Sequence, residues 1–192
     1  MSNIKNASGA TKRGRENRRL RAIITAGLVV FMNLVVNTPH EVFGDKNNLV
    51  EKGPQWHQLD KALALAKESG KHIVVNFYTD WCPNCKRMDE RTYHDDNVIE
   101  QLKDGFISVK INAESSKLLI IKGQTVTEEQ IANMFKIDLY PTTWFLSPDG
   151  RPLMPLRGYY GPKTFKPVLQ FVKGKWYESM TFDIYMKRKD KK

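Results

Sequence analysis

The chain has 192 residues, 41% of them hydrophobic, which is enough for one domain with a buried core and is unlike the composition of a disordered protein. Its net charge of +10 comes from the two ends: residues 1–38 and 187–192 carry twelve basic and two acidic residues, whereas residues 39–186 carry 19 of each. This neutral body has no basic patch interleaved with aromatic residues, which argues against a nucleic-acid partner.

Residues 1–38 have the layout of a targeting segment. A cluster of six basic residues is followed at once by an uncharged run, whose apolar part is Ala22–Val36. The cluster consists of Lys12, Arg13, Arg15, Arg18, Arg19 and Arg21. A basic stretch followed by an apolar one is typical of a secretory signal or a membrane anchor, whereas a buried core helix would leave the basic cluster unexplained.

The length of the apolar run favours a signal over a spanning helix. Residues 22–36 are too few for a helix that crosses a membrane, which needs about 20, and they fit a signal core of about 7–15. However, no small-residue cleavage site follows the run. We therefore predict a periplasmic or other extracytoplasmic protein, either soluble after cleavage or tethered to the inner membrane by residues 22–36.

Hydrophobic periodicity divides the rest of the chain into alternating helices and strands. Residues 39–55 form a polar lead-in or linker. The first half then predicts, in order, a helix over 59–70 that ends at Gly70, a buried strand over 72–79, a helix from Cys82 past Met88, a break at 93–97, a helix over 98–105 and a strand over 106–113.

The second half completes one α/β domain over residues 56–186. It predicts a hairpin around Lys122 and Gly123, a helix from Thr127, a strand–turn–strand unit over 142–159 and a closing helix over 166–174. Helices between strands imply parallel crossovers, and the late hairpin adds an antiparallel edge. Residues 175–186 are expected to pack back on the domain. Residues 187–192 are interpreted as a solvated basic tail, with contact to anionic lipid as the alternative.

The two cysteines of the chain, Cys82 and Cys85, are separated by Pro83 and Asn84. A disulfide that closes so short a loop removes little entropy from the unfolded chain, so a purely structural role is a weak explanation. Two thiolates do not complete a zinc site, and the four histidines show no ligand spacing. These are His40, His57, His72 and His94. No metal is expected, with a copper(I) site as the minor alternative.

A redox pair explains the two cysteines better. Cys82 is expected at the end of a strand and the start of a helix, where backbone N–H groups and the helix dipole stabilise a thiolate and lower the pKa of the thiol. Cys85 follows one helical turn later, close enough to attack a mixed disulfide formed at Cys82. Such a pair beside strands joined by helices is typical of thioredoxin-like redox sites.

Several stretches resemble thioredoxin-fold proteins over residues 56–175. They are VVNFYTD, WCPNCK and LYPTTWFLSPDG. The stretch CKRMDERTYHDDNVIEQL resembles the DsbD gamma domain and related exported thioredoxins more than cytosolic thioredoxin, which usually has a proline where this chain has Glu90. The segments GQTVTEEQIANMFKIDLYPTTWF and LRGYYGPKTFKPVLQFV are similar to periplasmic proteins of the SoxW and TlpA type. The resemblance implies a thioredoxin fold, with a mixed four- to five-stranded sheet flanked by helices, and a cofactor-free thiol:disulfide oxidoreductase.

The resemblance also implies roles for single residues. Cys82 would be the exposed nucleophile and Cys85 the buried resolving thiol. Trp81 would shield the disulfide, with plain packing as the alternative. Pro141 occupies the position of the family's cis-proline, where the preceding backbone pairs with a bound substrate chain, and Tyr140 would then lie beside the dithiol.

The chain departs from the family's pattern at Asn76. The family often has a buried acid there, proposed to shuttle protons to the resolving cysteine, and an amide cannot titrate. Lys110 matches the lysine that usually faces this acid, so the local field should be less negative and should favour a thiolate. Asp89 or Asp80 is a candidate replacement for the acid, although a solvated surface carboxylate is the simpler interpretation of both.

The lead hypothesis is an exported reductase of protein disulfides. Pro83 suits an early helical position, and the neutral Asn84 lacks the positive charge that a histidine would bring to a strong oxidant. A reductase outside the cytoplasm needs electrons from a membrane donor of the DsbD or CcdA type, which is an inference by analogy. The alternatives are a disulfide oxidase or isomerase, and a membrane-tethered protein that binds a partner or copper without catalysis.

Overall fold

The computed structural model describes residues 52–191, so the predicted targeting segment and most of the predicted lead-in lie outside the described residues. The elements in chain order are β1 (Trp56–His57), α1 (Leu59–Ser69), β2 (His72–Tyr78), α2 (Pro83–Arg91), α3 (Asp96–Gly105), β3 (Phe106–Asn112), β4 (Leu118–Ile121), β5 (Gln124–Thr127), α4 (Glu128–Met134), β6 (Thr142–Leu146), β7 (Pro152–Arg157), α5 (Pro162–Lys173), the 3₁₀ turn η1 (Trp176–Glu178) and α6 (Phe182–Lys189). None of the helices in this range has the length and apolar character needed to cross a membrane.

The main sheet has five strands in the order β1-β3-β2-β6-β7. Strand β2 pairs in parallel with β3, and helices α2 and α3 form the crossover between them. Strand β6 pairs antiparallel with both β2 and β7, so the late hairpin forms one edge of the sheet. The predicted α/β class and mixed sheet are therefore confirmed. Strand β1, which the sequence did not predict, adds the fifth strand beside β3.

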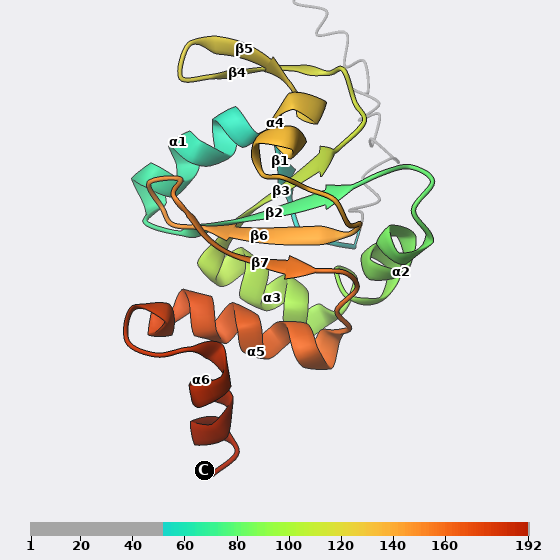
Figure 1. Ribbon diagram of the computed structural model, residues 1–192. Coiled ribbons are helices and arrows are strands. Elements are labelled where there is room, and N and C mark those ends of the chain that lie inside the picture. Colours follow the sequence, from blue (N-terminus) through green and yellow to red (C-terminus); the bar gives the residue numbers. More distant parts are fainter. Residues whose placement is uncertain (1–51, 192) are drawn as a thin grey trace, which may run out of the picture. The chain divides into compact units, whose positions relative to one another are not determined.

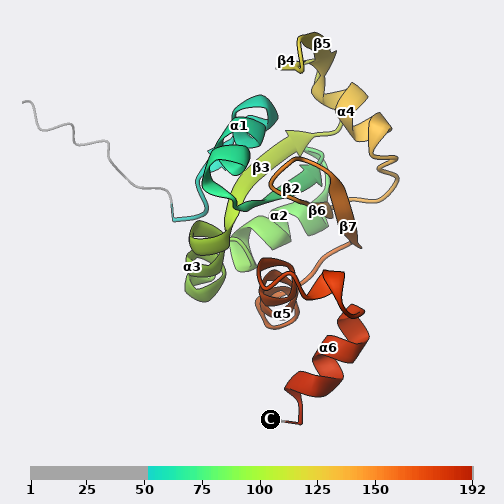
Figure 2. The same cartoon turned by 90° about the vertical axis from the view of Figure 1, so that its left-hand side faces the viewer.

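Helices cover the sheet on both faces. Because successive residues of β2 point to opposite sides, this strand contributes side chains to a core on each face. Figure 1 shows α1 and α4 above the sheet and α3 and α5 below it, and Figure 2 shows the same layers after a quarter turn. Ile73, Val75 and Phe77 of β2 belong to the core under α1 and α4. Val74 belongs to the second core, where it meets Phe165 of α5. Each such side chain contributes about 1.5–3 kcal/mol on full burial.

The predicted hairpin around Lys122 and Gly123 is present as a separate two-stranded sheet of β4 and β5. Both turn residues have positive φ, 51° and 80°, which matches the right-handed twist of the two strands. Leu119 points into the core under α1, whereas Leu118 and Ile120 are exposed. The hairpin therefore extends the α1 side of the domain beyond the main sheet.

The C-terminal segment packs back on the domain, as expected from the sequence. The rings of Phe182 and Tyr185 in α6 each lie 5.4 Å from the ring of Phe171 in α5. The predicted tail does not begin at residue 187, because α6 continues through Lys189. Its last turn contains Lys187, Arg188 and Lys189, whose charges interact favourably with the helix dipole.

A buried histidine joins the C-terminal segment to the sheet. The ring of His72 in β2 is 3% exposed, and its Nε2 lies 3.0 Å from the Tyr177 hydroxyl of η1. Burial, and then the positive charge of Lys175, lower the pKa of His72 from its ordinary value of 6.5. The folded state therefore takes up this proton less readily than the unfolded chain.

We expect the free energy of unfolding to fall as the pH drops below about 6.5, because protons then bind the unfolded chain preferentially. Urea midpoints measured on both sides of this pH would show the loss. The variant His72→Phe removes the titrating ring, so its pH profile should be flatter over the same interval. A variant profile as steep as that of the wild type would place the proton uptake at another residue.

Candidate active site

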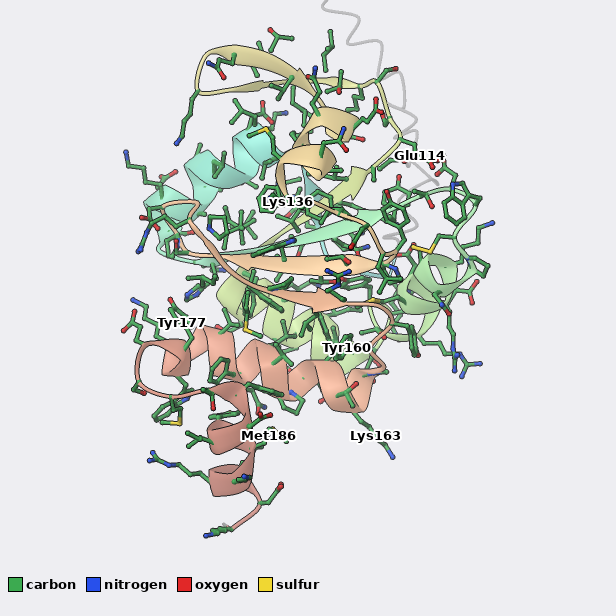
Figure 3. The ribbon with its side chains drawn as sticks, viewed as in Figure 1. Glu114, Lys136, Tyr160, Lys163, Tyr177 and Met186 are labelled. Carbon is green, nitrogen blue, oxygen red and sulfur yellow. A yellow bond between two sulfur atoms is a disulfide. The ribbon has the colours of Figure 1, made fainter. Side chains whose placement is uncertain are left out.

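The two cysteines lie at the N-terminal end of α2, where they form a disulfide with a Cα–Cα distance of 5.3 Å. Figure 3 shows this disulfide as a yellow bond at the start of the helix. Cys82 is the N-cap residue, and its Sγ accepts a hydrogen bond from the Cys85 backbone N–H at 3.1 Å. Pro83 occupies the first turn, where a missing N–H costs nothing, and Asn84 follows it on the exposed side.

Both cysteines are nearly covered in the disulfide form. Cys82 is 3% exposed and Cys85 is 2% exposed. The expectation of an exposed Cys82 is therefore wrong for this form. The reason is local: the Sγ of Cys82 is bonded to Cys85 and also accepts its N–H, so the sulfur is turned into the end of the helix.

Trp81 is held in place beside the disulfide by a residue that the sequence did not single out. Its ring is 63% exposed, and its Nε1–H donates to both carboxylate oxygens of Glu114, at 3.0 and 2.9 Å. The ring also makes an edge contact with Tyr140, with 6.0 Å between centroids. Next to it, the Asn112 amide donates to Asp80 at 3.0 Å. The loop before α2 is thus tied to the loop after β3.

Pro141 lies next to the strand that leads to the cysteines. Residue 142 pairs with Phe77 near the end of β2, so the preceding Pro141 lies beside the segment that runs from β2 to Cys82. The Tyr140–Pro141 peptide bond is cis, as the resemblance implies. The Pro141 carbonyl accepts a hydrogen bond from the Gly158 N–H at 2.7 Å, which fixes this loop against the end of β7. The structure therefore brings Trp81, Tyr140 and Pro141 to the cysteine end of the sheet.

Asn76 is completely buried in the middle of the sheet. Its backbone pairs with that of Lys110 in β3 and that of Thr143 in β6. Neither side-chain atom of Asn76 has a hydrogen-bond partner among residues 52–191. A buried amide without partners costs roughly 1–3 kcal/mol, so this position is not explained by stability.

Lys110 does not direct its charge to Asn76. Its ammonium lies 2.7 Å from the Asp89 carboxylate, and the two side chains are 25% and 28% exposed. The same ammonium lies 4.6 Å from the ring centre of Tyr78 and 5.7 Å from that of Trp56. The partner that the resemblance implies, position 76, is therefore replaced by Asp89, whose carboxylate is partly buried in an ion pair rather than fully solvated.

Tyr93 is a further polar residue beside these strands, and no motif in the sequence pointed to it. Its ring is buried, and its hydroxyl lies 3.2 Å from the Thr143 hydroxyl. Burial is the main reason why the pKa of Tyr93 is raised far above its ordinary value. Thr143 lies opposite Asn76 in the strand register and beside the Tyr93 hydroxyl, so the polar groups next to Asn76 on these strands are uncharged at neutral pH.

Comparison with known proteins agrees with this geometry. The sequence profile of the Thioredoxin-like domain family matches residues 59–173, which is more than half of the chain. A DsbD thiol:disulfide interchange protein of Vibrio cholerae is 31% identical over 96 residues, covering 50% of this chain and 14% of that protein. A DsbD of Vibrio vulnificus is 46% identical over 46 residues, covering 24% of this chain and 8% of that protein. The chain therefore matches only a small part of these longer relatives.

Solved structures support the fold. A thioredoxin-fold protein from Helicobacter pylori aligns with a TM-score of 0.56 at 19% identity, covering 64% of this chain and 86% of that one. A thioredoxin from Thermus thermophilus aligns with a TM-score of 0.52 at 24% identity, covering 62% and 87%. The family match, the fold and the disulfide at the start of α2 lead to one conclusion: this chain belongs to the thioredoxin-like domain family.

Proposed function

We propose that this protein is an exported reductase of protein disulfides, which works through Cys82 and Cys85. The observation that carries the proposal is the position of Cys82 at the N-cap of α2, where the Cys85 N–H already points at its sulfur. The same N–H and the helix dipole would stabilise the negative charge of a Cys82 thiolate. The similarity to DsbD thiol:disulfide interchange proteins supports the same chemistry.

The proposed reaction begins from the reduced form. The Cys82 thiolate attacks one sulfur of a substrate disulfide, the substrate S–S bond breaks, and the leaving thiolate takes up a proton. The Cys85 thiol then loses its proton and attacks the Cys82 sulfur, which releases the second substrate thiolate and forms the Cys82–Cys85 disulfide. Two electrons pass to the substrate, and a second dithiol must return two electrons before the next turnover.

The surroundings of the disulfide fit a protein substrate. Trp81 exposes most of its ring beside Cys82, and Tyr140 and Pro141 lie next to it. We propose that this end of the sheet receives the substrate chain. We also propose that the protein is periplasmic and takes its electrons from a membrane donor of the DsbD or CcdA type. The basic stretch followed by an apolar run before residue 39, a layout typical of a signal or an anchor, supports this proposal.

The reduction potential of the Cys82–Cys85 pair tests the direction of electron flow. We expect the purified protein to titrate nearer to thioredoxin, at about −270 mV, than to DsbA, at about −120 mV. Equilibration with glutathione and dithiothreitol buffers, read by mass after alkylation, gives the value. A potential close to that of DsbA would contradict a reductase and would favour the disulfide oxidase. If the dithiol and disulfide forms of Cys82 and Cys85 did not interconvert reversibly, both the reductase and the oxidase hypotheses would be contradicted.

A further inference from the structure

The C-terminal helix α6 carries apolar residues that the domain does not bury. Four of its eight residues are large and apolar, yet none of its residues is buried. Phe182 and Tyr185 face α5, whereas Ile184 is 45% exposed. Trp176 of η1 is 44% exposed as well. Figures 1 and 2 both show α6 extending beyond α5, away from the sheet, and Figure 3 labels Met186 on it.

The exposed face of α6 combines this apolar surface with positive charge. Ile184, Lys187 and Arg188 are spaced at i, i+3 and i+4, so they share one side of the helix. Both basic side chains are exposed. Residues 187–192 carry five basic residues and one acid, whereas residues 39–186 are balanced. The excess positive charge that follows the balanced part of the chain therefore lies at the same end as the partly exposed Trp176 and Ile184.

A hollow of about 530 Å³ lies between η1 and α6. Aromatic, thioether and basic side chains line this hollow: Trp176, Met180, Tyr185, Arg188, Lys189 and Lys191. The rings of Trp176 and Tyr185 are 6.1 Å apart. Lys189 is already engaged, because its ammonium donates to Gln170 of α5 at 2.6 Å. The hollow therefore offers apolar surface together with the charges of Arg188 and Lys191.

We infer that η1 and α6 form a membrane-surface contact that binds the phosphate headgroups of anionic phospholipids. Clusters of lysines and arginines are attracted to the phosphates of anionic lipids, and tryptophan and tyrosine rings favour the headgroup level of a membrane. The apolar stems of long basic side chains lie along the lipid boundary while their charges reach the phosphates. This assignment revises the interpretation of residues 187–192 as a purely solvated tail, and it goes beyond the proposed redox function.

Charge complementarity decides in favour of a lipid surface over a free anion. A single phosphate needs one or two cations, whereas this end offers a row of them next to exposed Trp176 and Ile184. An apolar side chain gains free energy from an acyl boundary but nothing from a dissolved ion. Each basic residue near an anionic surface contributes about a five-fold gain in binding, and the effect is screened by salt.

Hydrogen exchange on the full chain tests the contact locally, so that any binding by residues 1–38 does not obscure the result. A short helix without buried residues should exchange fast in solution. Vesicles of phosphatidylglycerol and phosphatidylcholine in equal parts should protect the peptides over 176–189, and pure phosphatidylcholine vesicles should not. The variant Lys187→Gln/Arg188→Gln should raise the lipid concentration needed for half-maximal protection about 25-fold, because it removes two charges at about five-fold in affinity each. Raising the salt to about 1 M should remove the protection.

The matched control is Lys61→Gln/Lys67→Gln on α1, which removes the same charge from two exposed lysines elsewhere in the domain. It should leave the protection at wild-type level, and so should Lys187→Arg/Arg188→Lys. Equal protection by both vesicle types, or equal losses in the control and the α6 variant, would overturn the inference. Protection by inorganic phosphate or by polyglutamate without vesicles would also overturn it, and would point to a free anion or to an acidic protein.

Discussion

Replacing Cys82 by serine is expected to abolish disulfide reduction. In an insulin reduction assay driven by dithiothreitol, we expect Cys82→Ser to lower the rate at least about a thousandfold, to the uncatalysed background. The reason is chemical: a serine hydroxyl at neutral pH is no substitute for the thiolate that attacks the substrate disulfide. Urea midpoints of the variant and of the reduced wild type should coincide, which would separate loss of chemistry from loss of fold.

The variant Cys85→Ser should stop the reaction at the mixed disulfide between Cys82 and the substrate. Cys82 can still attack a substrate disulfide, but no second thiol remains to release the product. One substrate chain should therefore stay attached to each protein molecule, visible by mass spectrometry without reductant and released by dithiothreitol. Turnover by Cys82→Ser, or no trapped adduct with Cys85→Ser, would contradict the assigned order of attack. Full insulin reduction by both variants would contradict the redox function itself.

Placing a carboxylate at position 76 is expected to make the protein sensitive to pH. Asn76 is fully buried, and its nearest cation by strand register, Lys110, already pairs with Asp89. Full burial can raise the pKa of a carboxyl group by about 3 units. At about 1.4 kcal/mol per unit, Asn76→Asp should lose about 4 kcal/mol of stability at neutral pH.

The sign of this effect gives a sharp test. The pKa of an Asp at position 76 should be higher in the folded protein than its unfolded value of about 3.9. The variant should therefore lose no stability below about pH 3.9, and the loss of stability should grow as the pH rises above it. Urea midpoints across this range should diverge from the wild type toward neutral pH. The control Asn76→Leu removes the two unpartnered atoms and should gain about 1–3 kcal/mol at every pH. Wild-type stability of Asn76→Asp at neutral pH would contradict this expectation, because it would require the new carboxylate to be solvated or paired with a cation such as Lys110.

The redox motif, the family and nearly all the helices and strands could be predicted from the sequence. Cys82 and Cys85 are three residues apart, and their place between a strand and a helix follows from local periodicity, which is a property of neighbouring residues. The turn at Lys122 and Gly123 was predicted for the same reason, since turn residues act within four positions. Strand β1 has only two residues, too few to show a period, so only its pairing with β3 reveals it.

The side-chain contacts around the disulfide could not be predicted from the sequence and follow from the packing of distant segments. Trp81 and Glu114 are 33 residues apart, and no spacing in the sequence links them. Strand register gives the backbone neighbours of a residue, but it does not determine which acid a long lysine side chain pairs with. Lys110 lies opposite position 76 in the register, yet its ammonium pairs with Asp89. The exposed face of α6 likewise depends on how the helix docks on Phe171. Contacts between distant segments follow from packing, which local periodicity does not encode.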